Sequence, residues 1–440
     1  MTGGHPVPEI LRYIAWADPV VCAADDTAAL CRALVPPPLD GPRTVVIEGI
    51  CLKVRPMKPW HIEICDVTLR DGGEQTPGVS FTRDEKMTIA HALDEIGVEV
   101  IEAGFPVVSA AEKECVAAIA GSGLSARVCC LARALKPDIE AALDCDVDMV
   151  SIFFATSDLH IRHKYHKPPR EEVLDGALDM VEFAADHGVQ VRFAAEDASR
   201  TDPPAFLIEM YNRGGVEHGA NYVSFADTVG CLTPLETHAV VSEILEGGPP
   251  HQLCIHCHND LGLAAANTVT AAAAGGAFQL HTTVNGIGER AGNAALEQVL
   301  VALRMKGGVD RYDLTRLQEI SRLVARASGV FPERTRPIVG ENAFAHESGI
   351  HIAAILCDPP STYEYVPPEL VGGERRFVLG KHTGRRALEH VAKAYGFDLS
   401  DDEARWVLEQ VKQKSEGKCS VTREVLCSLL RAAKEGGIVQ

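Results

Sequence analysis

Two histidines separated by one residue, His256 and His258, form the most distinctive chemical pattern in the chain. They close an apolar run, Leu253–Cys257, with the length and composition of a β-strand. Side chains at positions i and i+2 of a strand point to the same face, so we expect both imidazoles on one side. Asp71 closes an earlier run of the same kind. Two imidazoles and a carboxylate can bind a divalent metal and leave coordination positions open for a substrate, as a catalytic metal requires.

Other interpretations of this segment exist. His256 and His258 could be hydrogen-bonded core histidines. The stretch from Cys254 to His258 also fits the C-x-x-C-H pattern of haem attachment, and Cys254 with Cys257 could be a zinc or redox pair. Haem attachment requires export and an exposed loop, whereas a strand is expected here. On a strand the two cysteines point to opposite faces, so the metal site with Asp71 is the favoured interpretation.

Eight short apolar runs, with helix-like stretches between them, must position these residues. The runs are Ile62–Val67, Val98–Ala103, Arg127–Leu131, Met149–Phe154, Val189–Ala194, Asn221–Phe225, Leu253–Cys257 and His281–Val284. That number of strands predicts an α/β fold, a (β/α)8 TIM barrel. A doubly wound open sheet is the alternative, but it normally has a glycine-rich loop after its first strand, and Asp66–Asp71 occupy that place.

The chain divides into three predicted parts: an N-terminal extension (1–58), the barrel (59–325) and a small C-terminal loop and helical module (326–440). In the extension we expect a helix-like run at Ile10–Ala17 and a short strand at Thr44–Glu48. Helix starts are marked by capping-box spacing, with Glu three residues after Ser or Thr, at Thr82, Ser109 and Ser400. C-terminal helices are expected near Arg385–Tyr395, Ser400–Ser415 and Val421–Lys434.

Polar residues close most of the predicted strands. Because catalytic residues of TIM barrels lie at the carboxyl ends of the strands, we expect these side chains to meet at one mouth. The polar residues are Thr68, Arg70, Asp71, Glu74, Gln75, Arg192, Glu196, Asp197, Asp227, Thr228, His256, His258, Asn259, Asp260, Asn285 and Asn293. The glycines at 286–292 do not have dinucleotide-loop spacing, and a turn that brings Asn293 close to a metal or a phosphate fits better. The basic run His160–Lys167 is either a solvated loop or a dock for an anion.

Composition restricts the partners. The formal net charge of −19 over 440 residues argues against nucleic acid, which selects basic surfaces. Fourteen scattered cysteines indicate buried thiols in a reducing compartment. No uncharged apolar run reaches the roughly 18 residues of a membrane span, and no secretion signal is visible. We therefore expect a soluble, cytoplasmic protein without membrane contact.

At this point the motifs identify a family. Asp66–Gln75, His256–Asp260 and Gly286–Asn293 together resemble the isopropylmalate synthase and homocitrate synthase family, the Claisen-condensing DRE-TIM metallolyases. The similarity covers roughly residues 61–390 and is strengthened by Ala226–Gly230 and Phe344–His351. It implies an acyltransferase that joins the acetyl group of acetyl-CoA to a 2-oxo acid and releases CoA. Residues 1–58 have no counterpart in this resemblance.

The resemblance also implies roles for individual residues. The implied metal site, for Mn, Mg, Co or Zn, consists of Asp71, His256, His258 and Asn293. The implied catalytic residues are Arg70, Glu196, His351 and Tyr363. The implied substrate-binding residues are Gln75, His160, Arg192 and Thr228. In this family a neighbouring subunit supplies the counterparts of His351 and Tyr363, which implies a homodimer.

Arg192 bears on which 2-oxo acid is used. A buried guanidinium needs an anion, either a distal acidic group of the substrate or an internal partner such as Glu196 or Glu102. Arg192 resembles homocitrate synthases, whereas Ala194 stands where these typically have Ser, and Cys130–Ala134 resembles isopropylmalate synthases. The candidates are 2-oxoglutarate, giving homocitrate, and 3-phosphonopyruvate, giving the 2-phosphonomethylmalate of antibiotic biosynthesis.

Other activities are alternatives. A 2-isopropylmalate synthase or a citrate- or citramalate-forming synthase would share the same motifs. A hydroxymethylglutaryl-CoA lyase would need a catalytic Cys in the glycine-rich loop, and Gly286–Asn293 contains none. A catalytically silent binding protein would have lost some of Arg70, Asp71, His256 and His258, and all four are present.

Overall fold

The computed structural model describes residues 62–165, 169–248, 252–275, 277–356, 362–416 and 421–436, together with the backbone of three short N-terminal strands. The chain forms two compact units, one of Met1–Trp60 with Lys306–Val309, the other of His61–Met305 with Asp310–Gln440. The first unit contains an antiparallel sheet in the order β1-β3-β2, formed by Pro19–Val20 (β1), Arg43–Ile47 (β2) and Ile50–Val54 (β3). The strand predicted near Thr44 is β2, whereas the helix predicted at Ile10–Ala17 lies outside the described residues.

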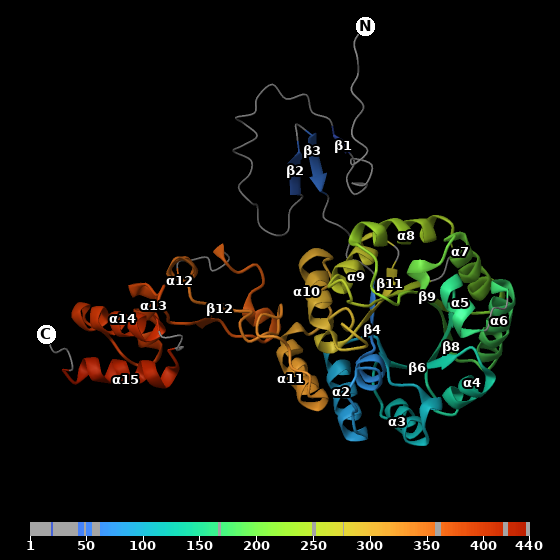
Figure 1. The fold of residues 1–440 in the computed structure, drawn as a ribbon, viewed down its shortest axis with the longest axis horizontal. Helices are drawn as coiled ribbons and strands as arrows, with labels where there is room; N and C mark the ends of the chain where they lie inside the picture. The colour runs from blue at the N-terminus through green and yellow to red at the C-terminus, as the bar shows by residue number, and fades with distance from the viewer. Residues whose placement is uncertain are drawn as a thin grey trace, which may run out of the picture. The chain divides into compact units, whose positions relative to one another are not determined.

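The second unit contains a closed barrel of eight parallel strands (Figure 1). The strands are β4 (Glu63–Asp66), β5 (Val100–Glu102), β6 (Arg127–Arg133), β7 (Met149–Ala155), β8 (Gln190–Glu196), β9 (Tyr222–Asp227), β10 (Gln252–Cys257) and β11 (Ala277–Thr282). They follow one another around the barrel in sequence order, and β11 closes it by pairing with β4. The predicted TIM barrel is confirmed, and each strand overlaps its predicted run. The largest difference is at β11, which begins at Ala277, before the predicted start at His281.

Helices cover the outside of the barrel, between its strands and after the last one (Figure 1). They are α2 (Arg83–Ile96), α3 (Ala110–Ala120), α4 (Lys136–Leu143), α5 (Asp158–Lys164), α6 (Arg170–Asp186), α7 (Ala205–Asn212), α8 (Pro234–Glu246), α9 (Ala264–Ala273), α10 (Leu296–Lys306) and α11 (Leu317–Ser328). The capping box predicted at Thr82 and Glu85 is present in both directions. At Ser109 only half of the predicted box forms, because the side chain of Glu112 binds Lys86 instead.

The C-terminal module begins with a two-stranded parallel pair, β12 (Ala345–His346) and β13 (Arg376–Phe377), and a short helix, α12 (Gly349–Ile355). Three helices follow close to their predicted ranges: α13 (Arg385–Ala394), α14 (Asp401–Glu416) and α15 (Arg423–Lys434). They pack around a core of their own, which includes Leu388, Val407, Val411, Leu426 and Leu430. Ser400 and Glu403 form the predicted capping box.

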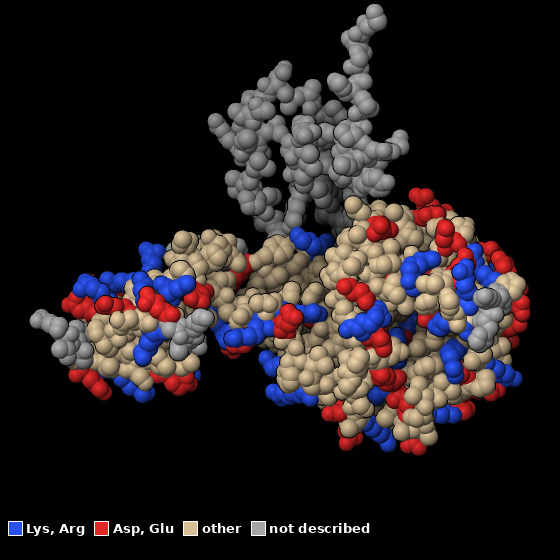
Figure 2. All heavy atoms as spheres, viewed as in Figure 1, with Lys and Arg blue, Asp and Glu red and all other residues tan. Residues whose placement is uncertain are grey.

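The described part of the chain contains no helix that is long and apolar enough to cross a membrane. On the face shown in Figure 2, acidic and basic side chains of the described residues are interspersed, and neither sign forms a continuous surface.

Candidate active site

Asp71, His256 and His258 meet at the carboxyl ends of strands β4 and β10. Asp71 lies on a short π-helix, Thr68–Gly72, that follows β4, and both histidines come from the end of β10. One ligand atom from each residue lies within 4.8 Å of the others, and all three residues are buried. The two Nε2 atoms are 3.2 Å apart, and His256 Nε2 is 3.4 Å from Asp71 Oδ2. Bonds of about 2.1 Å to one cation place neighbouring ligand atoms about 3–3.4 Å apart, so these atoms converge as metal ligands do.

The protonation states at this point also suit a cation. Burial, with a smaller effect of His256, lowers the pKa of His258 to about 3, so its imidazole is neutral. Burial alone would raise the pKa of Asp71, but Arg70 and His256 outweigh it and hold this pKa well below its usual range. Metal ligation requires a neutral imidazole and an ionised carboxylate. These residues therefore fit a divalent metal.

Asn293 is placed next to Asp71 by the glycine-rich turn. Its Nδ2 donates to Asp71 Oδ2 at 2.9 Å and to the carbonyl of Ile287 at 3.2 Å. A Cβ at Gly288 would lie 2.1 Å from this Nδ2, so the turn needs glycine there to let the amide approach. The Oδ1 atoms of Asn293 and Asp71 are buried and have no hydrogen-bond partner among the described residues. Unpartnered buried oxygens are costly, and a cation would satisfy them.

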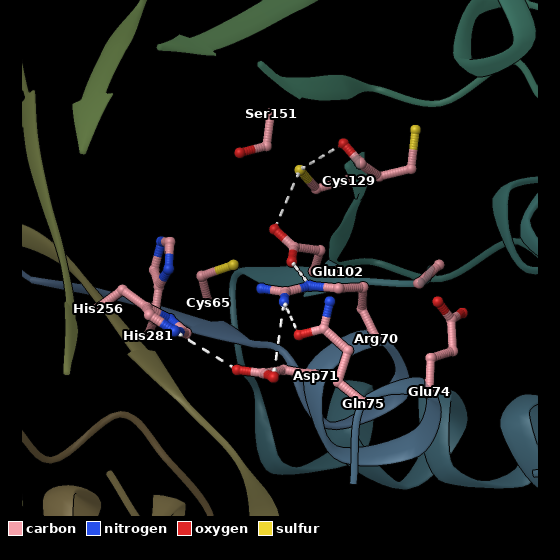
Figure 3. A network of polar contacts seen from close by, with 12 residues as sticks. Cys65, Arg70, Asp71, Glu74, Gln75, Glu102, Cys129, Ser151, His256 and His281 are labelled. Atoms are coloured by element: carbon pink, nitrogen blue, oxygen red, sulfur yellow. Dashed lines mark hydrogen bonds and ion pairs between the residues drawn. The ribbon is translucent and has the colours of Figure 1, made fainter. Parts of the chain in front are cut away.

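A chain of charged contacts joins the metal cluster to the barrel interior (Figure 3). Arg70 donates from Nε to Glu102 Oε1 at 2.5 Å and from Nη1 to Gln75 Oε1 at 3.1 Å. The other oxygen of Glu102 accepts from Arg192 Nη2. Arg192 is 1% exposed and also donates to Ser151 Oγ, at 3.0 Å. The internal partner that the sequence left as an alternative, Glu102, is therefore the observed partner of Arg192.

A cavity of about 160 Å3 opens beside these residues. Its lining includes Arg70, Gln75, Glu102, Ser151, Arg192, Ala194, Glu196, Ser224, Thr228, His256, His258 and His281. Most of the predicted substrate and catalytic residues therefore surround one space. Asn285, which the sequence also placed at the barrel mouth, does not line this cavity, because its side-chain amide binds Ser321 on α11.

Glu196 and Thr228 reach the cavity with defined partners. Both oxygens of Glu196 accept from Lys164 Nζ, at 2.6 and 2.8 Å, and His160 Nδ1 is 3.7 Å away. The basic segment thus contributes Lys164 to this corner, while its last two residues lie outside the described part. Thr228 Oγ1 accepts from the backbone N–H of Asp197 at 2.8 Å, and its own hydroxyl hydrogen can still be donated to another group.

His351 and Tyr363 lie together in the C-terminal module. Their rings stack with centroids 4.0 Å apart and planes 23° apart. Beside Tyr363, Glu364 is buried and accepts from Arg375 at 2.5 Å through both oxygens, which fixes the segment. Neither ring is among the described residues that line the barrel cavity.

The sequence did not single out the polar floor of the cavity. Ser151, Ser224 and His281 lie there, and His281 Nε2 is 3.0 Å from Arg192 Nη1. Burial, and then the positive charge of Arg192, keeps the pKa of His281 well below its usual value, so the neutral ring accepts from Arg192. One signal was available: Gln279 and His281 alternate with apolar residues, so a strand that starts earlier places both on the inner face.

A closed parallel barrel with a His, His and Asp cluster at the carboxyl ends of its strands defines a TIM-barrel enzyme with a candidate divalent-metal site. Residues 61–324 match the HMGL-like family, and residues 338–418 match the homocitrate synthase post-HMGL domain-like family. The chain therefore belongs to the HMGL-like family, in the form that carries this second domain.

Individual relatives agree with this assignment. Homocitrate synthase AksA of Methanosarcina acetivorans is 54% identical over 86% of this chain and 92% of its own length. (R)-citramalate synthase CimA of Methanocaldococcus jannaschii is 46% identical over 80% of this chain and 70% of its own. The crystal structure of the Bacillus subtilis HMG-CoA lyase superposes with a TM-score of 0.56 at 22% identity, over 63% of this chain and 98% of that one, which shows the shared fold.

Proposed function

We propose that this protein is a divalent-metal-dependent acyltransferase that condenses acetyl-CoA with a 2-oxo acid bearing a second acidic group, and that 2-oxoglutarate, giving homocitrate, is the substrate. The observation that carries this proposal is the convergence of Asp71 with His256 and His258, two histidines that line a cavity together with Arg70 and Arg192. The 54% identity to a homocitrate synthase over most of both chains supports the same reaction.

The charges around the cavity favour a dianionic substrate. The positive charges of Arg70 and Arg192 balance the negative charges of Glu102 and Asp71. Burial lowers the pKa values of His258 and His281, so both rings are neutral. The two positive charges of a bound cation are then left for the substrate, and a 2-oxo dicarboxylate cancels both. A monocarboxylate such as 2-oxoisovalerate would leave one charge unbalanced in a buried space, which is costly.

The floor of the cavity can hold the second acidic group. Ser224 lies in register beside Ala194 on the neighbouring strand and lines the cavity. It supplies a hydroxyl close to where typical homocitrate synthases have Ser in place of Ala194. Arg192 and its partner His281 lie at the same floor.

The residues at the mouth suit the condensation itself. Asp71, His256 and His258 would hold a divalent cation, which when bound would act as a Lewis acid toward the keto group. Arg70 stabilises the negative charge that develops on the keto oxygen as the new C–C bond forms, a role whose loss typically costs roughly 10²–10³ in rate. Thr228 donates to the carboxylate next to the keto group. Gln75 holds Arg70 in place, Lys164 holds Glu196, and His160, 3.7 Å from Glu196, contributes to substrate binding.

Proton transfer requires a base near the acetyl methyl group. We assign this step to His351 of a second copy of the chain, acting with Glu196, and Tyr363 orients the imidazole through the observed stack. The base removes a methyl proton, the resulting carbon attacks the keto carbon, and the keto oxygen gains a proton. Water then cleaves the thioester and releases CoA. A homodimer follows from this assignment.

The direct test is CoA thiol release from acetyl-CoA with four 2-oxo acids: 2-oxoglutarate, oxaloacetate, 3-phosphonopyruvate and 2-oxoisovalerate. We expect the highest kcat/KM with 2-oxoglutarate. 3-Phosphonopyruvate is the second candidate, favoured by the extra space at Ala194. Preference for 2-oxoisovalerate, or thiol release that does not depend on a 2-oxo acid, would contradict the proposal.

A further inference from the structure

A second charged cluster is buried behind the mouth of the barrel. Lys86, on α2, is 2% exposed. Its Nζ lies 2.8 Å from Glu74 Oε1, 2.6 and 2.8 Å from the two oxygens of Glu112, and 3.4 Å from the carbonyl of Ala103. A lysine is almost never buried to this extent unless it is paired, because moving an ammonium group out of water is expensive.

The cluster overrides a local preference of the sequence. Glu112 is placed to complete a capping box with Ser109, but its carboxylate binds Lys86 instead. The carboxylate also occupies the space where a side chain at position 104 would lie, since a Cβ at Gly104 would come within 1.8 Å of Glu112 Oε1. Local rules that are broken in this way usually mark functional positions.

Lys86 holds both segments that position Arg70. Arg70 has two side-chain hydrogen-bond partners, Gln75 and Glu102, besides its longer ion pair with Asp71 at 3.7 Å. Lys86 binds Glu74, the residue before Gln75, and the carbonyl of Ala103, the residue after Glu102. Figure 3 shows Glu74 beyond Gln75 on the same turn, directed away from the arginine. One ammonium group therefore fixes the spacing between the two groups that hold the guanidinium of Arg70.

We propose that Lys86, with Glu74 and Glu112, is a positioning device for Arg70 and thus for transition-state stabilisation in the condensation, an inference that rests on the proposed function. Lys86 is a positioning residue, because it lies outside the cavity lining and acts only through the segments it holds. Its loss leaves the ligands of the metal in place but lets Arg70 move.

The protonation state of Glu74 predicts different activities for two variants of this residue. Burial and the hydrogen bond with Glu112 raise the pKa of Glu74 to about 8, so at neutral pH Glu74 is largely a neutral carboxyl group. Gln has nearly the same shape and is neutral. Glu74→Gln should therefore lose much less activity than Glu74→Ala, which removes the contact.

The experiment measures kcat and both KM values for Lys86→Met, with Lys113→Met as the matched control, since Lys113 pairs with Asp144 on the surface. We expect Lys86→Met to lower kcat about 10- to 100-fold, as displacement of a single transition-state stabiliser does. Both KM values and the metal content should stay within about threefold of wild type, and Lys113→Met should match wild type.

A double-mutant cycle separates positioning from general stability. In an Arg70→Lys background, Lys86→Met should cost less than about twofold in kcat, since residues that act as a unit are non-additive. If Lys86→Met does not fold, Glu112→Gln removes one charge of the cluster at constant size, and the same non-additivity is expected. Additive losses, loss of metal, or a normal kcat in Lys86→Met would overturn the inference. Absence of thiol release in the wild type would instead contradict the proposed function.

Discussion

The barrel mouth and the C-terminal module both carry histidines of the predicted site, but the two groups differ in the sequence distance between their residues and in their burial. The mouth brings together Asp71 and His256 from distant parts of the sequence and buries them with their partners. The module places His351 and Tyr363 close in sequence, and Tyr363 is 45% exposed. The barrel residues surround a cavity, whereas neither module ring lines it among the described residues.

This difference separates the two halves of the proposed chemistry. The residues proposed for metal binding and charge stabilisation all belong to one barrel and already contact one another. His351 and Tyr363 form a stacked pair, and neither is among the described residues that line the barrel cavity. This is the arrangement expected if the proposed base acts in a second copy of the chain. The following predictions test that division.

The largest effect is expected at the metal cluster. His256→Ala removes one of three ligands, so kcat should fall at least ~10³-fold while far-UV circular dichroism stays unchanged. His187→Ala, which alters an exposed ring bonded to Phe183 O, is the control. Thiol release and metal content are the measurements. An unfolded His256→Ala protein would mean that the cluster is structural, and normal turnover would mean that it is not the active site.

The second-largest effect is expected at His351, the proposed base, and mixing two mutant subunits can test its role. His351→Ala should lower kcat roughly 10²- to 10³-fold with bound metal unchanged. When His351→Ala and His256→Ala subunits are unfolded together and refolded, hybrid dimers contain one intact composite site, and activity should recover to about a quarter of wild type. Failure to recover any activity, with dimers present, would show that each chain uses its own His351.

Selectivity should respond to Arg192 more moderately. Arg192→Lys keeps the charge but loses the fork that contacts Glu102 and Ser151. We expect kcat/KM for 2-oxoglutarate to fall about 10- to 100-fold and discrimination against 2-oxoisovalerate to weaken. Arg133→Lys is the control, because the Arg133 side chain is half exposed and pairs with Asp138 away from the cavity lining. Unchanged selectivity would show that Arg192 serves only its internal ion pair with Glu102 and does not select the substrate.

The smallest effect concerns the pH dependence of stability and tests the buried strand ends of the barrel. Burial raises the pKa of Asp66 to about 7, although hydrogen bonds from Thr68 and Thr282 act in the opposite direction. The folded state therefore binds this proton more tightly than the unfolded chain does. The resulting stability is fully present below about pH 4, the unfolded value, and is lost as pH rises through 7.

Asp66→Asn removes this dependence. Relative to the variant, the wild-type free energy of unfolding should decrease by roughly 1–3 kcal/mol between pH 4 and 8. Urea titrations of metal-free protein at several pH values measure it, with Asp310→Asn on the surface as the control. Parallel pH profiles for wild type and Asp66→Asn would show that Asp66 is ionised throughout.

The sequence predicted the parts of the fold and site that depend on local patterns. All eight strands, the barrel and the meeting of Asp71, His256 and His258 follow from strand periodicity and from the rule that parallel strands present their carboxyl ends together. Asn293 next to Asp71 follows from the glycine-rich turn.

Contacts between distant segments could not be read from local patterns. The pairing of Arg192 with Glu102, rather than Glu196, depends on the inward direction of side chains on β5 and β8. The diversion of Glu112 from its capping box depends on Lys86, which lies on a different helix. Both are ion pairs between elements, and a sequence shows the charges without showing which ones meet.

The most direct test of the metal-dependent condensation is thiol release from acetyl-CoA and 2-oxoglutarate by protein that has been exhaustively chelated and then titrated with Mn, Mg, Co or Zn. We predict that activity disappears on chelation and returns in proportion to bound metal, up to about one ion per chain. Full activity in protein shown to contain no metal would contradict the assignment of Asp71, His256 and His258.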